Sequence, residues 1–582
     1  MDHVQSRYQL WSSNPFFDWQ TREELLAIAD QPQEIEDRFY RDLAFGTAGL
    51  RGVIGAGTNR MNRYTVVRAA DGFARYIASL GTEAKQRGVV ISYDSRRFSD
   101  LFARLTAAVM IRYGIRTRLS DILRPVPVLS YAIRHYQAVG GIMITASHNP
   151  AQYNGFKAYG GDGGQLPPEA ADQVSAFIST VQDWTQLNMP DETSVGQSDL
   201  FAWIGDELDQ AYDDQLKKLI INHEAIQRQA DMKIVFTPLH GAGSKPVRRI
   251  LRAIGFRQVQ IVPEQQDPDP DFSTVASPNP EDRAALAMAI QLAEKNQADI
   301  VIATDPDGDR TGLAVRDADG RIVVLSGNQI GILLTDYILS AHQKAGTMPE
   351  NPFVVTTIVS TKLMRRIAAH YHVSLFECLT GFKFIAELIQ EKDELGDMHY
   401  LFGFEESFGY LAGTEVRDKD AVVTSMLIAE MAAAARDQNQ TLYEKLDQLY
   451  QRFGYAAEQT LSIVMEGKEG LEAIEQTMDT LRRDMKRFAQ MNVSAVNDYD
   501  QSIRTELMTG EKQRLDFPRS NVLLYELDDL DWFCVRPSGT EPKIKIYFGC
   551  YDSDPSVCES RMTAIRDLVE KQIRDLLTGD VP

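Results

Sequence analysis

Residues 140–159 read GGIMITASHNPAQYNGFKAY. The apolar run Gly141–Thr145 predicts a buried strand. The polar sequence SHNP at 147–150 ends it, because proline fixes its own φ and disfavours a helical conformation for the residue before it. Open α/β sheets place their chemistry at the carboxyl ends of strands. The Ser147 hydroxyl is therefore a candidate reactive group, and Lys157 follows in a segment that can fold back toward it; a serine turn that only ends a strand is the alternative.

A repeated order of elements predicts the architecture. Strand, polar turn, helix and strand follow one another in three parts of the chain, which begin at residues 89, 233 and 353. Each copy then runs to an apolar strand and a polar loop, and these ends read GGIMITASHNP, ADIVIATDPDGDR and MHYLFGFEESFGY. Strands that alternate with helices favour right-handed βαβ units. We therefore expect three successive α/β domains of similar topology with mixed, mostly parallel sheets, whose loops face a central cleft.

The C-terminal part breaks this pattern. Strands are expected at 460–464, 521–525, 532–535 and 544–547, with helices at 470–490 and 555–577. Strands without alternating helices predict an α+β domain with an antiparallel sheet. The first 45 residues are expected to be helical, mainly at 23–29 and 34–43. The resulting domains are 1–205, 206–325, 326–455 and 456–582.

Composition limits the classes of function. The chain has 582 residues, which is too long for one core, and its 44% apolar and 25% charged residues are typical of soluble globular proteins. A net charge of −21 argues against a nucleic acid or an anionic membrane as partner. The four cysteines show no CxxC spacing, which argues against zinc and favours a reducing compartment. The N-terminus lacks the pattern of a signal peptide, and Ala421–Ala435 is too short to span a bilayer. We therefore expect a cytoplasmic location.

Two glycine-containing loops carry candidate ligands for ions. Arg51 lies in FGTAGLRG at 45–52, where glycines expose backbone N–H groups that suit an anion; a glycine turn without a ligand is the alternative. Asp305, Asp307 and Asp309 lie at i, i+2 and i+4 in DPDGDR, and their hard oxygen ligands favour Mg²⁺, with Ca²⁺ as the alternative. Three packed carboxylates repel one another unless a cation offsets them. The loop is not an EF-hand, because its glycine is fourth and Arg316 stands twelfth.

Two further loops carry groups suited to a polar ligand. The sequence FEES at 404–407 offers two carboxylates and a hydroxyl, which suit the recognition of vicinal hydroxyls; a second metal site or an acid/base pair is the alternative. The sequence RPSGT at 536–540 indicates a phosphate clamp, because arginine offers a planar fork and glycine lets the backbone approach. Cations lie in or beside these loops and would draw a dianionic ligand: Arg51, Lys157, Arg310, Lys419, Arg536 and Lys543.

The segments TASHNPxxYNGxK, TDPDGDR, GFEES and RPSGTEPK together resemble the α-D-phosphohexomutase superfamily of phosphoglucomutases and phosphomannomutases. FGTAGLRG resembles its longer phosphoglucomutase/phosphopentomutase branch. The match covers all four segments in order. It implies a four-domain enzyme with a phosphoserine at Ser147 and with Mg²⁺ held by Ser147, Asp305, Asp307 and Asp309.

The resemblance also implies roles for the other loop residues. These are sugar-hydroxyl recognition by Glu405 and Ser407, binding of the second phosphate by Arg536, Ser538, Gly539, Thr540 and Lys543, and electrostatic or proton-transfer roles for Arg51, His148, Lys157, Arg310 and Lys419. The implied reaction interconverts α-D-glucose 1-phosphate and glucose 6-phosphate, with glucose 1,6-bisphosphate as intermediate and activator.

Other activities stay open at this point. Phosphomannomutase and phosphopentomutase would use the same mechanism. A phosphatase that works through phosphoserine would not need the clamp at Arg536, and an inactive sugar-phosphate sensor would not need Ser147 and the three aspartates. The expected partners are small sugar phosphates, with neither nucleic acid nor membrane, and the expected state is a monomer, with a dimer as the alternative.

Overall fold

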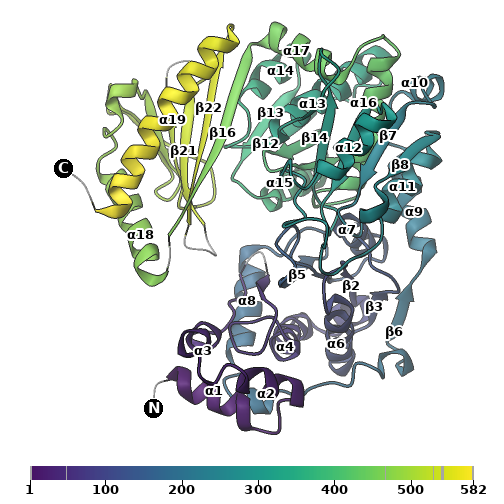
Figure 1. Ribbon diagram of the computed structural model, residues 1–582, viewed down its shortest axis with the longest axis vertical. Helices are drawn as coiled ribbons and strands as arrows, with labels where there is room; N and C mark the ends of the chain where they lie inside the picture. The colour runs from purple at the N-terminus through teal and green to yellow at the C-terminus, as the bar shows by residue number, and fades with distance from the viewer. Residues whose placement is uncertain (1–2, 47–48, 466, 528–529, 539–542, 580–582) are drawn as a thin grey trace. The chain divides into compact units, whose positions relative to one another are not determined.

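The computed structural model describes residues 3–46, 49–465, 467–527, 530–538 and 543–579. The chain forms two compact units, each built from segments that are discontinuous in the sequence. The first unit comprises Met1–Gly327, Ala386–Phe402 and Ser407–Thr441, and the second comprises Asn328–Ile385, Gly403–Glu406 and Leu442–Pro582. Figure 1 shows the elements of both, coloured along the sequence.

The first unit contains a mixed six-stranded sheet in the order β1-β5-β4-β2-β3-β6. Its strands are β1 (Leu50–Val53), β2 (Val89–Tyr93), β3 (Thr117–Ser120), β4 (Gly140–Ile144), β5 (Tyr153–Gly160) and β6 (Phe201–Ile204). β2, β3, β4 and β6 run parallel, whereas β5 is antiparallel to β1 and β4. Because β2 and β4 are parallel neighbours, the turns after Tyr93 and Ile144 meet at one edge of the sheet.

Helices cover this sheet and form a second small core. They are α1 (His3–Ser13), α2 (Trp19–Leu26), α3 (Pro32–Phe39), α4 (Arg63–Ser79), α5 (Thr82–Arg87), α6 (Ser99–Arg112), α7 (Val126–His135) and α8 (Pro168–Ser179). α4, α6 and α8 share an apolar core with the sheet, whereas α1–α3 pack around Trp11 and Phe17, whose rings stack at 4.3 Å. The helices predicted in the first 45 residues are present, but α2 and α3 begin and end earlier than the ranges 23–29 and 34–43.

A five-stranded sheet in the order β11-β10-β9-β7-β8 also lies in the first unit. Its strands are β7 (Lys233–Thr237), β8 (Gln258–Ile261), β9 (Ile300–Thr304), β10 (Thr311–Arg316) and β11 (Ile322–Val324), and the neighbouring helices are α9 (Asp206–Lys217), α10 (His223–Arg228), α11 (Ser244–Ala253) and α12 (Ala287–Asn296). β7 is parallel to β8 and β9, and β10 returns antiparallel to β9. β9 is fully buried, so the acidic loop that follows it starts from the core.

A four-stranded sheet in the order β13-β12-β14-β15 follows along the chain. The elements of this region are β12 (Pro352–Thr357), β13 (Ser374–Cys378), β14 (His399–Glu405), β15 (Gly409–Ala412), α13 (Gly327–Ala345), α14 (Leu363–Tyr371), α15 (Phe382–Leu395), α16 (Ala421–Arg436) and α17 (Leu442–Phe453). β12 and β13 are parallel and flank α14, as the repeated order predicts. α16 is buried along most of its length, and none of the helices in the described ranges is long and apolar enough to cross a membrane.

The C-terminal sheet is antiparallel throughout, in the order β16-β22-β21-β20-β17-β18-β19. Its elements are β16 (Tyr455–Val464), β17 (Ala495–Asp498), β18 (Ile503–Glu506), β19 (Lys512–Arg514), β20 (Leu523–Glu526), β21 (Trp532–Pro537), β22 (Lys543–Asp552), α18 (Gly467–Arg483) and α19 (Pro555–Thr578). Both helices pack against one face of the sheet (Figure 1). The predicted α+β domain is confirmed, but the sequence prediction missed β17–β19 and extended α18 to residue 490.

Candidate active site

Ser147 lies just beyond β4 in an uncommon backbone conformation. Its φ is 53°, in the left-handed region, and its N–H donates to Thr145 Oγ1 at 2.8 Å. The hydroxyl donates to Asp305 Oδ2 at 2.9 Å and lies 3.2 Å from His148 Nδ1. Non-glycine residues held in this region cluster at functional sites, where the surrounding structure compensates the strain. The strand end that the sequence singled out therefore delivers a buried hydroxyl directly to the acidic loop.

The loop after β9 brings three carboxylates together. Asp305, Asp307 and Asp309 are buried, and each offers an oxygen within 4.8 Å of the others. Asp305 Oδ1 accepts from the backbone N–H groups of Asp309 and Arg310, both at 3.0 Å, which closes the loop. Gly308 makes the turn at a φ of 63°. The loop is thus shaped by Asp305 itself and needs its glycine.

A divalent cation fits this donor set. Asp307 Oδ1 and Asp309 Oδ1 are buried and have no hydrogen-bond partner among the described residues. Burial and the neighbouring Asp307 and Asp309 raise the pKa of Asp305 well above its usual range. Hard carboxylate oxygens in this arrangement suit Mg²⁺ and leave coordination positions for a phosphate oxygen or water.

Two lysines compensate part of the negative charge. Lys157 Nζ, on β5, lies 2.8 Å from Asp307 Oδ2 and 3.4 Å from Asp309 Oδ2. Lys419 Nζ lies 3.3 Å from Asp309 Oδ2 and 3.1 Å from Asp418 Oδ1. Burial lowers the pKa of Lys157, but the two aspartates outweigh it and raise the pKa above its usual value. Burial raises the pKa of Asp309, and the two lysines then bring it below its usual value.

The other predicted cationic and proton-transfer residues surround the Ser147 loop. Arg51 donates to Asn149 Oδ1 at 3.1 Å, and Arg310 forms an ion pair with Glu281. Desolvation, together with Arg310 and Arg51, lowers the pKa of His148 well below its ordinary value. The His148 imidazole is therefore neutral near pH 7.

Arg96 was not predicted from the sequence, but its side chain holds the backbone of the Ser147 loop in place. Its guanidinium donates to the carbonyl oxygens of Ser147, Asn149, Pro150 and Tyr153 and is paired with Asp94 at 3.3 Å. The side chain is buried. Its position in the turn after β2, next to the turn after β4, was the available signal.

The second unit carries the other predicted binding residues except Ser407. Glu405 ends β14 and is buried, and the half-buried Glu406 accepts from Thr357 Oγ1 at 3.3 Å. Burial, together with Glu405, raises the pKa of Glu406 to about 7, although Lys545 and Arg536 act in the opposite direction. Ser407 belongs to the first unit.

One face of the β21–β22 hairpin gathers basic side chains. Arg536 lies directly opposite Lys545, and Ser538 N–H donates to Lys543 O at 2.8 Å. Ile544 and Ile546 point into the core, so Lys543 and Lys545 point to the opposite face. Lys545 was not among the sequence candidates, although the alternation of residues 543–546 was a signal for it. Gly539 and Thr540 lie outside the described residues.

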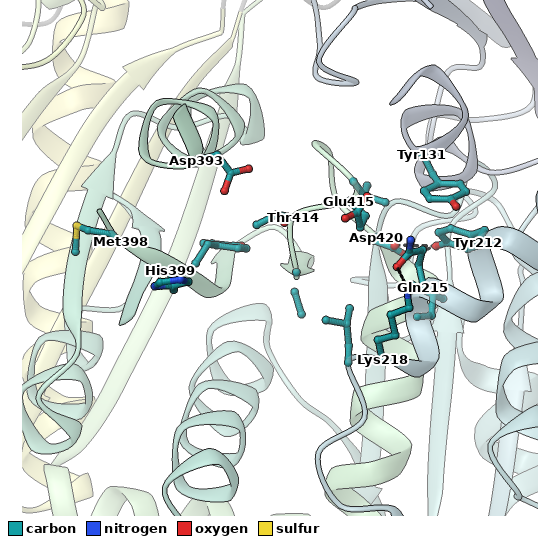
Figure 2. A pocket seen from close by; sticks show the side chains of 16 residues that line it. Tyr131, Tyr212, Gln215, Lys218, Asp393, Met398, His399, Thr414, Glu415 and Asp420 are labelled. Atoms are coloured by element: carbon teal, nitrogen blue, oxygen red, sulfur yellow. Dashed lines mark hydrogen bonds between the residues drawn. The ribbon is translucent and has the colours of Figure 1, made fainter. Parts of the chain in front are cut away.

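A separate cavity of about 340 Å³ lies in the first unit (Figure 2). Figure 2 shows Tyr212 hydrogen-bonded to Asp420 on one side and His399 and Met398 on the other. Neither Ser147 nor the three aspartates line it, but Asp420 directly follows Lys419. The cavity is therefore not the site that the motifs predicted.

Family models and curated relatives agree on which proteins this chain resembles. Models of the phosphoglucomutase/phosphomannomutase α/β/α domains I, II and III match residues 42–183, 210–320 and 326–453. The phosphoglucomutase of Staphylococcus aureus (strain MRSA252) is 39% identical over 530 residues, which are 90% of this chain and 93% of that protein. The phosphoglucomutase of Staphylococcus haemolyticus (strain JCSC1435) is 37% identical, over 88% of this chain and 91% of that one.

Solved structures share the fold. Parafusin, a phosphoglucomutase from Paramecium in an open form, aligns with a TM-score of 0.68 at 19% identity over 93% of this chain and 96% of its own. A putative phosphomannomutase from Thermus thermophilus aligns with a TM-score of 0.63 at 23% identity, over 91% of this chain and 99% of that one. At these identities the similarity concerns the fold alone.

Proposed function

This chain belongs to the phosphoglucomutase/phosphomannomutase family of the α-D-phosphohexomutase superfamily, and on that premise we propose that it is a phosphoglucomutase. It interconverts α-D-glucose 1-phosphate and glucose 6-phosphate through a phosphorylated Ser147 and a glucose 1,6-bisphosphate intermediate. The observation that carries the proposal is the Ser147 hydroxyl, held 2.9 Å from Asp305 inside a cluster whose negative charge is only partly compensated. The curated relatives named above support the choice of reaction.

Asp305, Asp307 and Asp309 would hold Mg²⁺ together with an oxygen of phosphorylated Ser147. When bound, the ion neutralises negative charge on the phosphoryl oxygens during transfer. The orphaned buried oxygens of Asp307 and Asp309 support this assignment.

The side chains around Ser147 serve the transfer itself. The Ser147 O–P bond breaks as a sugar hydroxyl forms a new bond to phosphorus and loses its proton. Lys157 and Lys419 lie where they can offset charge on the transferring group, which is the main contribution of protein groups to phosphoryl transfer. His148, neutral and 3.2 Å from Ser147 Oγ, is placed to accept or return a proton. Arg51 and Arg310 add positive charge beside the Ser147 loop.

A mutase needs a second phosphate site, because the bisphosphate turns round before its other phosphate returns to serine. We assign this site to Arg536, Ser538, Gly539, Thr540 and Lys543. Arginine and backbone donors beside hydroxyls suit a phosphate dianion. Glu405 and Ser407 are assigned to adjacent sugar hydroxyls, since a carboxylate accepts from two O–H groups at once.

The substrate panel is the decisive experiment. The purified protein is assayed with the 1-phosphates of glucose, mannose and ribose, with Mg²⁺ and a catalytic trace of the matching bisphosphate. We expect the highest kcat/KM for glucose 1-phosphate and weaker activity on mannose 1-phosphate, because these sugars differ only at C2. A higher kcat/KM for ribose 1-phosphate would replace the assignment by phosphopentomutase, and release of free phosphate as the main product would indicate a phosphatase.

The setting follows from the reaction. The proposed partners are small sugar phosphates, with glucose 1,6-bisphosphate as activator, and the proposed location is the cytoplasm. The four cysteines are free and buried, which suits a reducing compartment. We propose that the enzyme acts as a monomer; light scattering of the purified protein tests this.

A further inference from the structure

Glu406 occupies a place that the proposed reaction does not use. It follows Glu405 at the end of β14 and is half-buried in the second unit. Titratable and charged groups of three strands interact with it: Glu405 on β14, Cys534 and Arg536 on β21, and Lys545 and Tyr547 on β22. Lys362, at the start of α14, interacts with Cys534. Lys362 is itself paired with Glu377 at 2.7 Å. The carboxyl therefore lies beside the basic face of the hairpin rather than in a neutral core.

The hydrogen bonds of Glu406 fit either of its protonation states. Thr357 Oγ1 lies 3.3 Å from Glu406 Oε2 and 2.9 Å from Ser360 Oγ. An ionised carboxylate accepts from the Thr357 hydroxyl. A protonated carboxyl can donate to the same hydroxyl, which then donates to Ser360, because either hydroxyl of that pair can be the donor. Neither state leaves a buried polar atom unpaired in this chain of contacts.

We propose that the Glu406 carboxyl exchanges a proton with solvent as a sugar phosphate binds to the basic face of the hairpin and leaves it. The carboxyl takes up the proton when the dianionic phosphate binds beside Arg536 and Lys545, and it releases the proton when the phosphate leaves. The inference rests on the proposed function, because it takes the hairpin face to be the second phosphate site. Glu406 is a positioning residue here, and it forms no bond to the sugar.

The physical cause is the change in the local field. In the free protein, Arg536 and Lys545 stabilise the ionised carboxylate against burial and against Glu405, and the balance sets a pKa of about 7. A bound dianion offsets both cations and adds repulsion, so the pKa of Glu406 rises on binding. A group whose pKa rises on binding takes up protons at any pH between the two values. Affinity for the dianion should then fall as pH rises above 7.

Calorimetry measures the proton directly. Glucose 6-phosphate is titrated into the Ser147→Ala variant with Mg²⁺ at pH 8, in Tris and in HEPES, whose ionisation enthalpies differ. The sugar phosphate is already dianionic at this pH, since its second pKa is near 6. We expect uptake of up to one proton per bound molecule and a rise in Kd of up to ~10-fold between pH 7 and 8, the limits for one linked carboxyl.

Two second-site variants decide the assignment. Adding Glu406→Gln should abolish both the proton uptake and the pH dependence of Kd. Adding Asp336→Asn should change neither; Asp336 is a half-buried carboxyl of the same unit whose pKa burial raises, and it accepts a hydrogen bond from Tyr371 at 2.7 Å.

The measurements separate a failure of this inference from a failure of the proposed phosphate site. If Arg536→Ala weakens binding but no proton is taken up, or if uptake persists with Glu406→Gln, the inference is wrong while the phosphate site stands. If Arg536→Ala binds glucose 6-phosphate as tightly as the parent, the phosphate site is wrong and the inference falls with it.

Discussion

The Ser147 cluster of the first unit and the basic hairpin face of the second unit handle charge in opposite ways. In the cluster, three carboxylates and two ammonium groups are buried, and the ion pairs between them span 2.8–3.4 Å. On the hairpin face, Arg536, Lys543 and Lys545 are half-buried, and the register of two strands sets their spacing. One region carries part of its counter-charge with it, whereas the other gathers basic side chains at half-buried positions.

This difference separates two tasks. Buried charges are tolerable only when partners are already in place, so the cluster is ordered before any substrate arrives. A half-exposed basic face receives counter-charge from its ligand and can adapt to it. Substitutions in the cluster should therefore lower kcat, and substitutions on the hairpin face should mainly raise KM.

The largest expected effect is the loss of turnover on substitution of Ser147. Ser147→Ala should remove the phosphoryl carrier and lower turnover by ~10⁵-fold or more. Intact-mass spectrometry should find one labile phosphate on the parent protein and none on the variant. Ser179→Ala, at an exposed serine that ends α8, is the control and should keep both the phosphate and the turnover. Normal turnover by Ser147→Ala would remove the cluster from the chemistry altogether.

The next effect concerns the metal. Asp307→Ala should lower kcat by at least ~10³-fold with a much smaller change in KM, because the loop side chain contributes charge at the reacting group rather than core packing. Treatment of the parent with EDTA should abolish activity, and Mg²⁺ should restore it. Thermal unfolding checks that the variant is folded. Activity that survives exhaustive EDTA treatment would contradict the Mg²⁺ assignment.

A smaller effect, mainly on KM, is expected at Arg536. Arg536→Ala removes a charge-assisted contact to the distal phosphate, which should cost roughly 2–4 kcal/mol in kcat/KM, mostly through KM. Arg519→Ala, at an exposed arginine of the same unit that is paired with Asp500, is the matched control. A fall in kcat with unchanged KM would break the proposed division between the two regions.

The smallest effect is expected at Lys545. Lys545→Met should raise KM by roughly 5- to 10-fold, because a lysine is a point charge without the two-pronged geometry of arginine. Steady-state kinetics at constant ionic strength measures it. An effect larger than that of Arg536→Ala would make Lys545 the principal anchor.

The sequence predicted the loops better than their surroundings. The strand before Ser147 and the carboxylate spacing of 305–309 are local patterns, and the structure places Ser147, Asp305 and Lys157 together as the motifs suggest. Lys419, in contrast, was predicted from its charge and from the resemblance, without a local pattern that fixes its position. Its position depends on Asp418, which Tyr159 and Gln165 hold at 3.1 Å from more than 250 residues away. No local pattern contains such a contact.

Weak or nonlocal signals account for the missed elements. β17, β18 and β19 are three or four residues long, and β19 is exposed along its length, so they lack a run of alternating apolar residues. Arg96 acts by donating to backbone carbonyls of a distant loop, and its function depends on the pairing of β2 with β4. The predicted domain boundaries and the roles of the individual site residues stay predictions.

The long separations within the Ser147 cluster have a consequence for synthesis. Ser147 and Asp305 are 158 residues apart, and Tyr159 and Asp418 are 259 residues apart. A nascent chain released from the ribosome before Asp305 has no acceptor for the serine hydroxyl, and one released before Lys419 has an acidic loop without one of its two ammonium groups. Contacts this distant in sequence cannot form until both segments have been synthesised. Premature termination within this span should therefore leave fragments that cannot carry the phosphoryl group, and mutase activity should appear only with chains that also include the second phosphate site assigned to residues 536–543.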